Sequence, residues 1–466
     1  MNLKALTSAI LLASLPTTGV FAAALDRSGQ SIQSFLQPGN YFEAGISVLD
    51  ADVSGKMRDN WRAPVSTSDH TKNLAGTEIS DMAESYYFPS AALKLQLNDQ
   101  LSFGLIYDQP FGAKAEYSGN DKVLSKSDTS QGALNGGKFD GQGQGAFIGS
   151  GESTKVDVTT QNLSLIFGYQ PTENWNVYAG PVYQTVKGDV QLRGAAYGPF
   201  GGSICAKSLP CGNFNEYGTT NYYKGYNANI GEDSAVGWLA GFAYQIPDIA
   251  LKASLTYRSE IDHTVSINES VPFAKDTWAA GPVPGLKNIT YTEGSTKVTT
   301  PQSVNLDLQT GIMANTVAFA QLRWVEWSKF SIRPHQFNQA SQVLTQSAGA
   351  GNDGFALVAY DKDQISANVG VGRKFNEQWA GTVMVGWDSG AGNPVSTLGP
   401  TEGYWSVGLG GQFSPTPQTF IQAGVKYFML GDAKAQVASY YGTDIYDAEF
   451  KDNDAIGYSL KMGYRF

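Results

Sequence analysis

The chain has 466 residues, of which 53 are glycine, 12% are aromatic and only 16% are charged, and its formal net charge is −10. Disordered chains combine much charge with few aromatic residues, so this composition excludes them. The negative charge argues against nucleic acid as a partner, because phosphate binding needs a basic surface.

Residues 1–22 have the features of a secretory signal peptide. Lys4 is the only charged residue in this segment, an apolar run covers 5–15, and Val20 and Ala22 are small residues at the −3 and −1 positions of a cleavage site. Cleavage after Ala24 fits as well. The apolar run is too short to cross about 30 Å of hydrocarbon as a helix, so the segment predicts export rather than a membrane anchor.

The two cysteines, Cys205 and Cys211, lie in a stretch rich in glycine and proline. In an oxidising compartment this spacing predicts a small disulfide loop, with two free thiols as the alternative. The count and the spacing exclude a CxxC redox motif and a cysteine-based zinc site.

After the signal segment, apolar and polar residues alternate with period two. Ile456, Tyr458 and Leu460 begin one such series, which alternates with small or charged residues up to the last residue, Phe466. The segments 163–169, 251–257 and 421–429 alternate in the same way. This pattern is typical of strands with one apolar and one polar face, and the first strand is expected over 41–53.

The connections between these strands alternate between two sizes. Six are short turns, at 98–100, 171–174, 247–248, 314–315, 376–378 and 414–417. Seven are long polar loops, around 54–83, 118–155, 194–233, 271–296, 333–354, 391–402 and 439–453. Thirteen connections join fourteen strands. This layout predicts an all-β, 14-stranded antiparallel transmembrane β-barrel over 41–466, with short periplasmic turns and long extracellular loops, in the outer membrane of a Gram-negative bacterium.

A secreted β-sandwich or propeller is the soluble alternative, because one buried face also produces alternation. Aromatic residues at the expected strand ends favour the barrel, since they match the girdles at the two membrane interfaces. These residues are Trp175, Tyr178, Trp379, Trp405, Tyr464 and Phe466.

Several short segments, taken in order, resemble the FadL family of outer-membrane channels for hydrophobic compounds. The segments Asn98–Gly104 and Asp108–Gly112 resemble the second turn and third strand of that family. Tyr257-Arg258-Ser259-Glu260 resembles a segment of a middle strand, and Trp324–Phe330 resembles a Trp-Ser-x-Phe segment. The resemblance implies passive movement of long-chain fatty acids or, in some members, aromatic hydrocarbons.

The resemblance also implies a lateral exit through the barrel wall where the third strand is kinked. In that strand Pro110 lacks a ladder donor and Gly112 lacks a side chain, and Phe111 lies between them. We therefore expect the pairing with a neighbouring strand to break at Pro110, Phe111 and Gly112. An ordinary bulge at the barrel rim is the alternative.

An N-terminal plug inside the barrel is the second feature implied by the resemblance. Here only residues 23–40 precede the first strand, and the Asn-Pro-Ala motif of the family is absent. Ile32, Phe35 and Leu36 are the apolar residues expected to hold a short plug in the lumen. A periplasmic tail is the alternative.

Aromatic residues in two long loops predict a groove that captures ligand above the barrel, although such loops also pack only on each other. They are Tyr197, Phe200, Phe214, Tyr222, Tyr223, Phe273 and Trp278. A second group of charged residues is expected to line the lumen. There the cations either contact the carboxylate of a ligand or pair with nearby acidic side chains of the barrel. This group consists of Lys252, Arg258, Glu260, Arg323, Glu326 and Arg373.

No enzyme site is predicted. His70, His263 and His335 lie far apart without a metal-ligand spacing, and Ser68-Asp69-His70 is a weak indication of catalysis. We expect no metal, no cofactor and no nucleic acid. The expected partners of this barrel, a monomer, are hydrophobic small molecules and outer-membrane lipid. A general aqueous porin, an aromatic-hydrocarbon channel, and a barrel enzyme or adhesin are the alternatives.

Overall fold

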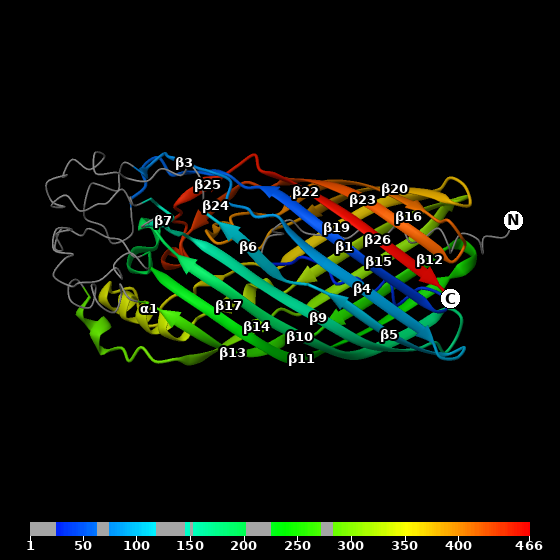
Figure 1. Ribbon diagram of the computed structural model, residues 1–466, viewed down its shortest axis with the longest axis horizontal. Coiled ribbons are helices and arrows are strands. Elements are labelled where there is room, and N and C mark those ends of the chain that lie inside the picture. The colour runs from blue at the N-terminus through cyan, green and yellow to red at the C-terminus, as the bar shows by residue number, and fades with distance from the viewer. Residues whose placement is uncertain (1–24, 63–73, 118–144, 150–151, 202–224, 272–282) are drawn as a thin grey trace.

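The computed structural model describes residues 25–62, 74–117, 145–149, 152–201, 225–271 and 283–466. The chain forms a closed antiparallel barrel whose strands tilt against the long axis (Figure 1). β1 pairs with β26 on one side and with β4 on the other, so the sheet has no free edge where the chain begins and ends. This closure satisfies the backbone groups that would otherwise face lipid.

Seventeen strand segments make up the barrel. They give fourteen strands, because three strands are each divided into two segments, and the predicted strand number is confirmed. In chain order they are β1 (Tyr41–Asp52), β4 (Tyr86–Gln96), β5 (Leu101–Asp108) with β6 (Gly112–Glu116), β9 (Lys155–Tyr169), β10 (Trp175–Leu192), β11 (Tyr226–Ile246), β12 (Leu251–Arg258) with β13 (Ile261–Ser270), β14 (Gly294–Thr300) with β15 (Ser303–Met313), β16 (Thr316–Val325), β19 (Gln364–Lys374), β20 (Trp379–Asp388), β22 (Tyr404–Phe413), β23 (Thr419–Leu430) and β26 (Asp454–Arg465).

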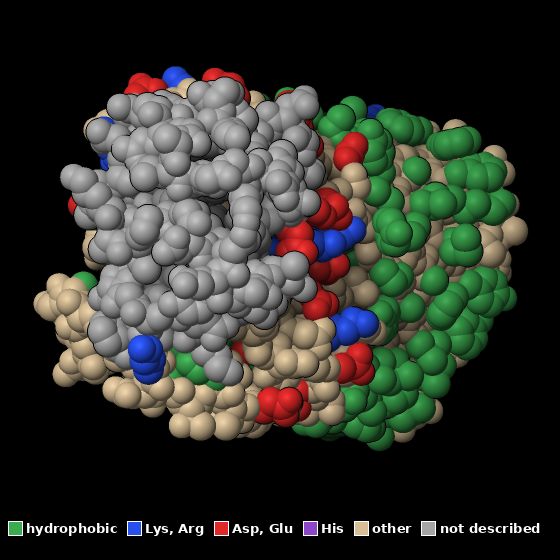
Figure 2. All heavy atoms as spheres, turned by 60° about the vertical axis from the view of Figure 1, so that its left-hand side comes forward, with side chains coloured by type: hydrophobic (Ala, Val, Ile, Leu, Met, Phe, Trp, Pro, Cys, Tyr) green, Lys and Arg blue, Asp and Glu red, His purple; other side chains and the backbone are tan. Residues whose placement is uncertain are grey.

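The two faces of the strands follow the period-two pattern. In β12, the side chains of Ser254, Thr256 and Arg258 are buried toward the lumen. In β26, Tyr458 and Leu460 are exposed on the outer face. On the face shown in Figure 2, apolar side chains cover the wall, and a row of charged side chains borders them on one side. These apolar side chains form the band that a barrel presents to lipid.

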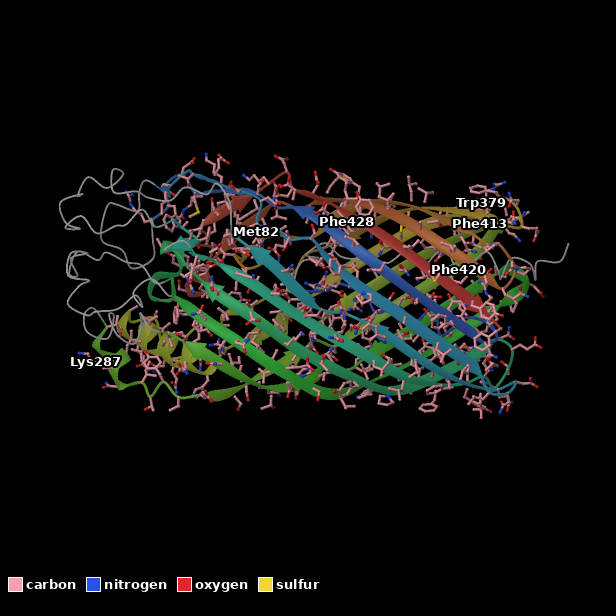
Figure 3. All side chains as sticks on the ribbon, viewed as in Figure 1. Met82, Lys287, Trp379, Phe413, Phe420 and Phe428 are labelled. Atoms are coloured by element: carbon pink, nitrogen blue, oxygen red, sulfur yellow. The ribbon has the colours of Figure 1, made fainter. Side chains whose placement is uncertain are left out.

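The six predicted short turns join strands at one end of the barrel, where the C-terminus also lies (Figure 1). Trp379 and Phe413 lie at this end in Figure 3, with ring centroids 4.8 Å apart. Tyr178 does not belong to an outer girdle as expected. Its side chain faces the lumen and is buried, because Tyr178 shares its face of β10 with the buried Val182.

The described parts of the long connections fold into a cap at the other end. Three of them contribute a second, five-stranded sheet in the order β21-β24-β25-β2-β3. The expected loop at 333–354 contains the helix α1 (His335–Ser347), and the loop expected to end at 233 ends earlier, because β11 begins at Tyr226. None of the helices in the described ranges is long and apolar enough to cross a membrane. The short cap elements are β2 (Gly55–Met57), β3 (Glu78–Ile79), β7 (Ile148–Gly149), β8 (Glu152–Ser153), η4 (Ala195–Phe200), η8 (Pro284–Asn288), η9 (Trp327–Lys329), β17 (Ser331–Ile332), β18 (Val358–Ala359), β21 (Val395–Ser396), β24 (Ala433–Gln436), η10 (Ala438–Tyr440) and β25 (Ala448–Phe450), and η6 (Pro247–Ile249) lies in a short turn.

Candidate transport site

A window in the wall lies between β4 and the kinked third strand. β4 pairs with β5 only up to Ala91 and Tyr107, and beyond this point β6 pairs with β9 but not with β4. An isolated bridge between Ala83 and Ala115 closes the upper end of the interruption. We call the unpaired stretch, residues 84–90 opposite 108–114, the window.

The kink has a defined geometry on its paired side. From Asp108 to Gly112 the third strand advances four residues, while its partner β9 advances three, from Asn162 to Thr159. The extra residue is a bulge, which was the alternative expectation for this segment. The bulge therefore occurs against β9, and loss of pairing occurs against β4.

A cavity of about 90 Å³ lies at the lower end of the window. Phe88 and Ser90 of β4 and Ile106 of β5 line it on the window side. Polar side chains line the rest, from the N-terminal segment (Ser28, Ser31, Ser34), from β1 (Glu43, Ser47) and from β16 and β26 (Gln321, Lys461). Pro89 also lines it and has no N–H to donate across the interruption. Sequence reasoning missed Pro89, although a proline inside the strand-like run 86–96 is a signal for lost pairing.

Residues 25–40 lie inside the barrel and close the window from the lumen. The backbone N–H of Arg27 donates to the Pro110 carbonyl at 2.6 Å, and the Gly112 N–H donates to the Leu25 carbonyl at 2.8 Å. Farther along, Phe35 packs edge-on against Tyr178 with ring centroids 5.7 Å apart. Ile32, Phe35 and Leu36 are buried together in one apolar cluster with inward-facing wall residues.

The lumen cations mostly bind this N-terminal segment rather than the acids considered from the sequence. Arg323 forms a buried ion pair with Asp26 at 2.7 Å, Arg258 donates to the Gln30 carbonyl at 2.8 Å, and Lys252 donates to the Leu36 carbonyl at 2.9 Å. These contacts tie the segment to two strands of the wall, β12 and β16.

The other three residues expected in the lumen lie elsewhere. Arg373 is exposed on the outer face of β19, because it shares the period-two face of the exposed Val369 and Val371. Glu260 is exposed at the break between β12 and β13. Glu326 lies at the cap end of β16, where it pairs with Lys329 at 2.8 Å.

An apolar cavity of about 390 Å³ lies within the cap, between η4, α1 and η10. Tyr197 and Phe200 line it, as expected for the capture groove. Phe214, Tyr222, Tyr223, Phe273 and Trp278 lie outside the described residues, as do Cys205, Cys211 and His70. The helix α1 adds residues that were not predicted, Phe337 and Leu344, although their helical spacing in the sequence was a usable signal.

A carboxylate holds α1 against the barrel. Glu269 of β13 accepts hydrogen bonds from the backbone N–H groups of Gln336 and Phe337 at 2.7 and 2.9 Å, which are free donors at a helix N-terminus. Phe337 then stacks near Phe200, with centroids 4.2 Å apart. Burial raises the pKa of Tyr440, on the opposite side of the cavity, to about 12, so its hydroxyl stays neutral.

No metal centre is found in the part of the chain that the structure describes: three or more His, Cys, Asp or Glu side chains do not gather there. His263 is buried in β13 between Asp233 and Gln184, at 2.9 Å from each. It is a buried wall residue whose two ring nitrogens are both engaged in hydrogen bonds with side chains of neighbouring strands.

The closed barrel, its lipid-facing band and its capped end define an integral outer-membrane β-barrel. The model of the family described as Outer membrane protein transport protein (OMPP1/FadL/TodX) matches residues 141–466. The chain belongs to this family, which consists of transport channels, and the resemblance noted from the sequence is confirmed.

Solved structures give the same fold at low identity. A Pseudomonas aeruginosa FadL homologue superposes with a TM-score of 0.61 at 16% identity, covering 92% of this chain and 91% of that chain. The P. putida toluene transporter TodX gives 0.53 at 15% identity, over 93% and 91%. The Ralstonia pickettii toluene transporter TbuX gives 0.50 at 12% identity, over 97% of each chain. No curated protein matches the chain.

Proposed function

We propose that the protein is a passive channel for hydrophobic compounds, with long-chain fatty acids as its cargo. Cargo is captured in the apolar cavity of the cap and leaves sideways through the window into the membrane. Both solved toluene transporters named above share the fold, so an aromatic hydrocarbon is the alternative cargo.

The window carries this proposal. Backbone groups in lipid need hydrogen-bond partners, and at the window the third strand finds them at Leu25 and Arg27 of the N-terminal segment rather than at β4. An interruption of the wall that depends on a separate segment in this way needs a use. A hydrophobic cargo supplies one, because it can enter the bilayer without crossing water. The cap cavity supports the same route, since its volume and aromatic lining are typical of small-molecule sites.

Residues 25–40 support a lateral rather than an axial path. This segment is bound to β12 and β16 by the contacts of Lys252, Arg258 and Arg323. We propose that it acts as the plug and blocks a wide aqueous passage along the axis. A general porin would instead need a continuous water-filled lumen.

The test fills the window. Ser90→Trp places an indole in the 90 Å³ cavity at the end of the window, which lies between the wall and the N-terminal segment. Bacterial cells that lack their own fatty-acid channel and express this variant should lose most uptake of radiolabelled oleate. The matched control is Ala423→Trp, which adds the same ring to the lipid-facing side of the fully paired β23 and should transport like the parent.

Two further measurements separate the alternatives. Toluene uptake in the same cells tells which cargo the parent carries. A small hydrophilic solute should enter equally in all three strains, and a fall with Ser90→Trp would favour the porin. Normal oleate uptake by Ser90→Trp, with the heat-dependent gel shift of a folded barrel, would refute the lateral exit.

A further inference from the structure

One buried side chain spans the window on its lumen side. The guanidinium carbon of Arg27 lies 4.1 Å from the centre of the Tyr86 ring, which belongs to β4. On the other side the same group lies against β6, where a Cβ at Gly112 would come within 2.4 Å of the guanidinium carbon. Arg27 therefore contacts both strands at the place where they do not pair with each other.

Gly112 makes this position possible. Any side chain at 112 would overlap the guanidinium and also the Val158 carbonyl, at 2.6 Å. Glycine is the residue that permits such close approach. Gly112, which the sequence predicted as a break in pairing, thus makes room for the buried guanidinium of Arg27. The sequence does not reveal this contact because the two residues are 85 positions apart.

Among the described residues the direct polar partner of the Arg27 guanidinium is the neutral side chain of Tyr86, and no carboxylate pairs with it. Arg323 pairs with Asp26, whereas none of the carboxylates in the described ranges forms an ion pair with Arg27, and its Nε is buried without a hydrogen-bond partner there. Asp157 on β9 acts on it electrostatically without direct contact. A buried guanidinium normally has an anionic partner, so an open donor here points to an anionic ligand.

We propose that Arg27 binds the carboxylate of a fatty acid as the cargo passes the window. Guanidinium and carboxylate match in geometry and form strong charge-assisted hydrogen bonds. The acid head is held at the lumen side while the alkyl chain enters the membrane. This inference rests on the proposed exit and refines it, because it makes Arg27 the residue that favours fatty acids over neutral hydrocarbons.

The test compares two cargoes that differ only in the head group, oleate and oleyl alcohol, in the cell assay described above. The parent should take up oleate faster than the alcohol. Arg27→Gln should lower oleate uptake about tenfold, as expected for loss of a charge-assisted contact, and leave the alcohol within about twofold. Arg27→Lys should fall between the two, because it keeps the charge and loses the fork. Arg373→Gln is the control, since that arginine is exposed on the outer face.

The outcomes distinguish failure of the proposal about Arg27 from failure of the proposed transport function. If the parent takes up neither cargo above cells without the protein, the proposed function fails. If the parent shows no preference for the acid, the binding of the carboxylate is refuted without any variant. Equal loss of both cargoes in Arg27→Gln would mean that Arg27 only holds the N-terminal segment, and no loss of either would mean that it does not act on cargo.

Discussion

Two interruptions of the barrel wall look alike along the chain but differ in what they do. The third strand breaks between β5 and β6, and its neighbour β4 continues, so one side of the break is left unpaired. On another part of the wall β12 and β13 break at Ser259 and Glu260, and the neighbouring strand breaks at the same level, at Pro301 and Gln302.

The second break stays closed because its pairing continues in the same register above and below it. Arg258 pairs with Ser303 on one side and Ile261 with Thr300 on the other. This continuity holds on the side of β14 and β15. On the other side β11 pairs with β12 from Leu239 to Ile246 and with β13 only from Asn227 to Ile230, and the Ser259 N–H donates to the Trp238 carbonyl at 2.9 Å between these two stretches. Between these two pairs of segments the ladder therefore resumes in register because both strands break at the same level, whereas β4 does not break with the third strand.

The largest effect should come from restoring the missing donors at the window. Pro89→Val and Pro110→Thr together give both edges a backbone N–H and a strand-favouring side chain. We expect oleate uptake to fall to near the level of cells without the protein. Gly112 is kept, because a side chain there would collide with Arg27 and with the backbone of β9.

Pro301→Val is the matched control at the closed break. It also replaces a strand-breaking proline, but the segments on both sides of it are already paired with β12 and β13 in one register, so uptake should not change. If both variants lose uptake equally, or neither does, the difference between the two breaks has no bearing on transport.

The sequence predicted the barrel well because its signals are local. Period two, turn residues and the alternation of short and long connections gave the strand number, all six short turns and the first strand. It predicted Pro110 and Gly112 as a break but not which neighbour would be lost. That depends on the register of three strands and on the extra residue of the bulge against β9.

The site was less predictable because its parts meet only in the folded chain. The cap cavity joins Tyr197 to Phe337 and Tyr440, which come from three separate connections. The lumen cations were expected to meet strand acids, yet they bind backbone carbonyls and Asp26 of the N-terminal segment. A backbone carbonyl has no sequence signature, so no pattern in the chain indicated those partners.

The second prediction concerns the N-terminal segment, residues 25–40, which covers the window from the lumen. Phe35 is buried where Gly104 of β5 and Gly168 of β9 leave room for its ring. Phe35→Ala should lower the free energy of unfolding by about 3–5 kcal/mol, the usual cost of emptying such a site. It should also raise the leak of a small hydrophilic solute, measured as liposome swelling, because the segment loses its main apolar contact.

Ile32→Ala changes a smaller side chain of the same cluster and serves as the comparison. It should raise the leak of the hydrophilic solute less than Phe35→Ala does. A stability loss without any leak would show that the segment is a structural filler and not a plug. Unchanged stability would contradict the contacts described for the ring.

The smallest effect is expected at the closed break, from Gln302→Ala. Gln302 accepts a hydrogen bond from the Tyr257 hydroxyl and donates one to Glu326, each at 2.7 Å. Their loss should cost about 1–2 kcal/mol, because the side chain is only partly buried and water replaces part of the bonding. The urea midpoint of unfolding should therefore fall slightly, while oleate uptake stays at the parent level.

Gln302→Ala and the double variant Pro89→Val with Pro110→Thr have opposite aims. The double variant is designed to close the unpaired stretch at the window, whereas Gln302→Ala removes side-chain hydrogen bonds at the break between β12 and β13. Backbone pairing of β12 with β15 and of β13 with β14 remains in Gln302→Ala, so side-chain loss alone should not create an exit. A rise in oleate uptake that survives Ser90→Trp would show a second lateral path at this break, and the closed state of the wall would then depend on Gln302 rather than on strand register.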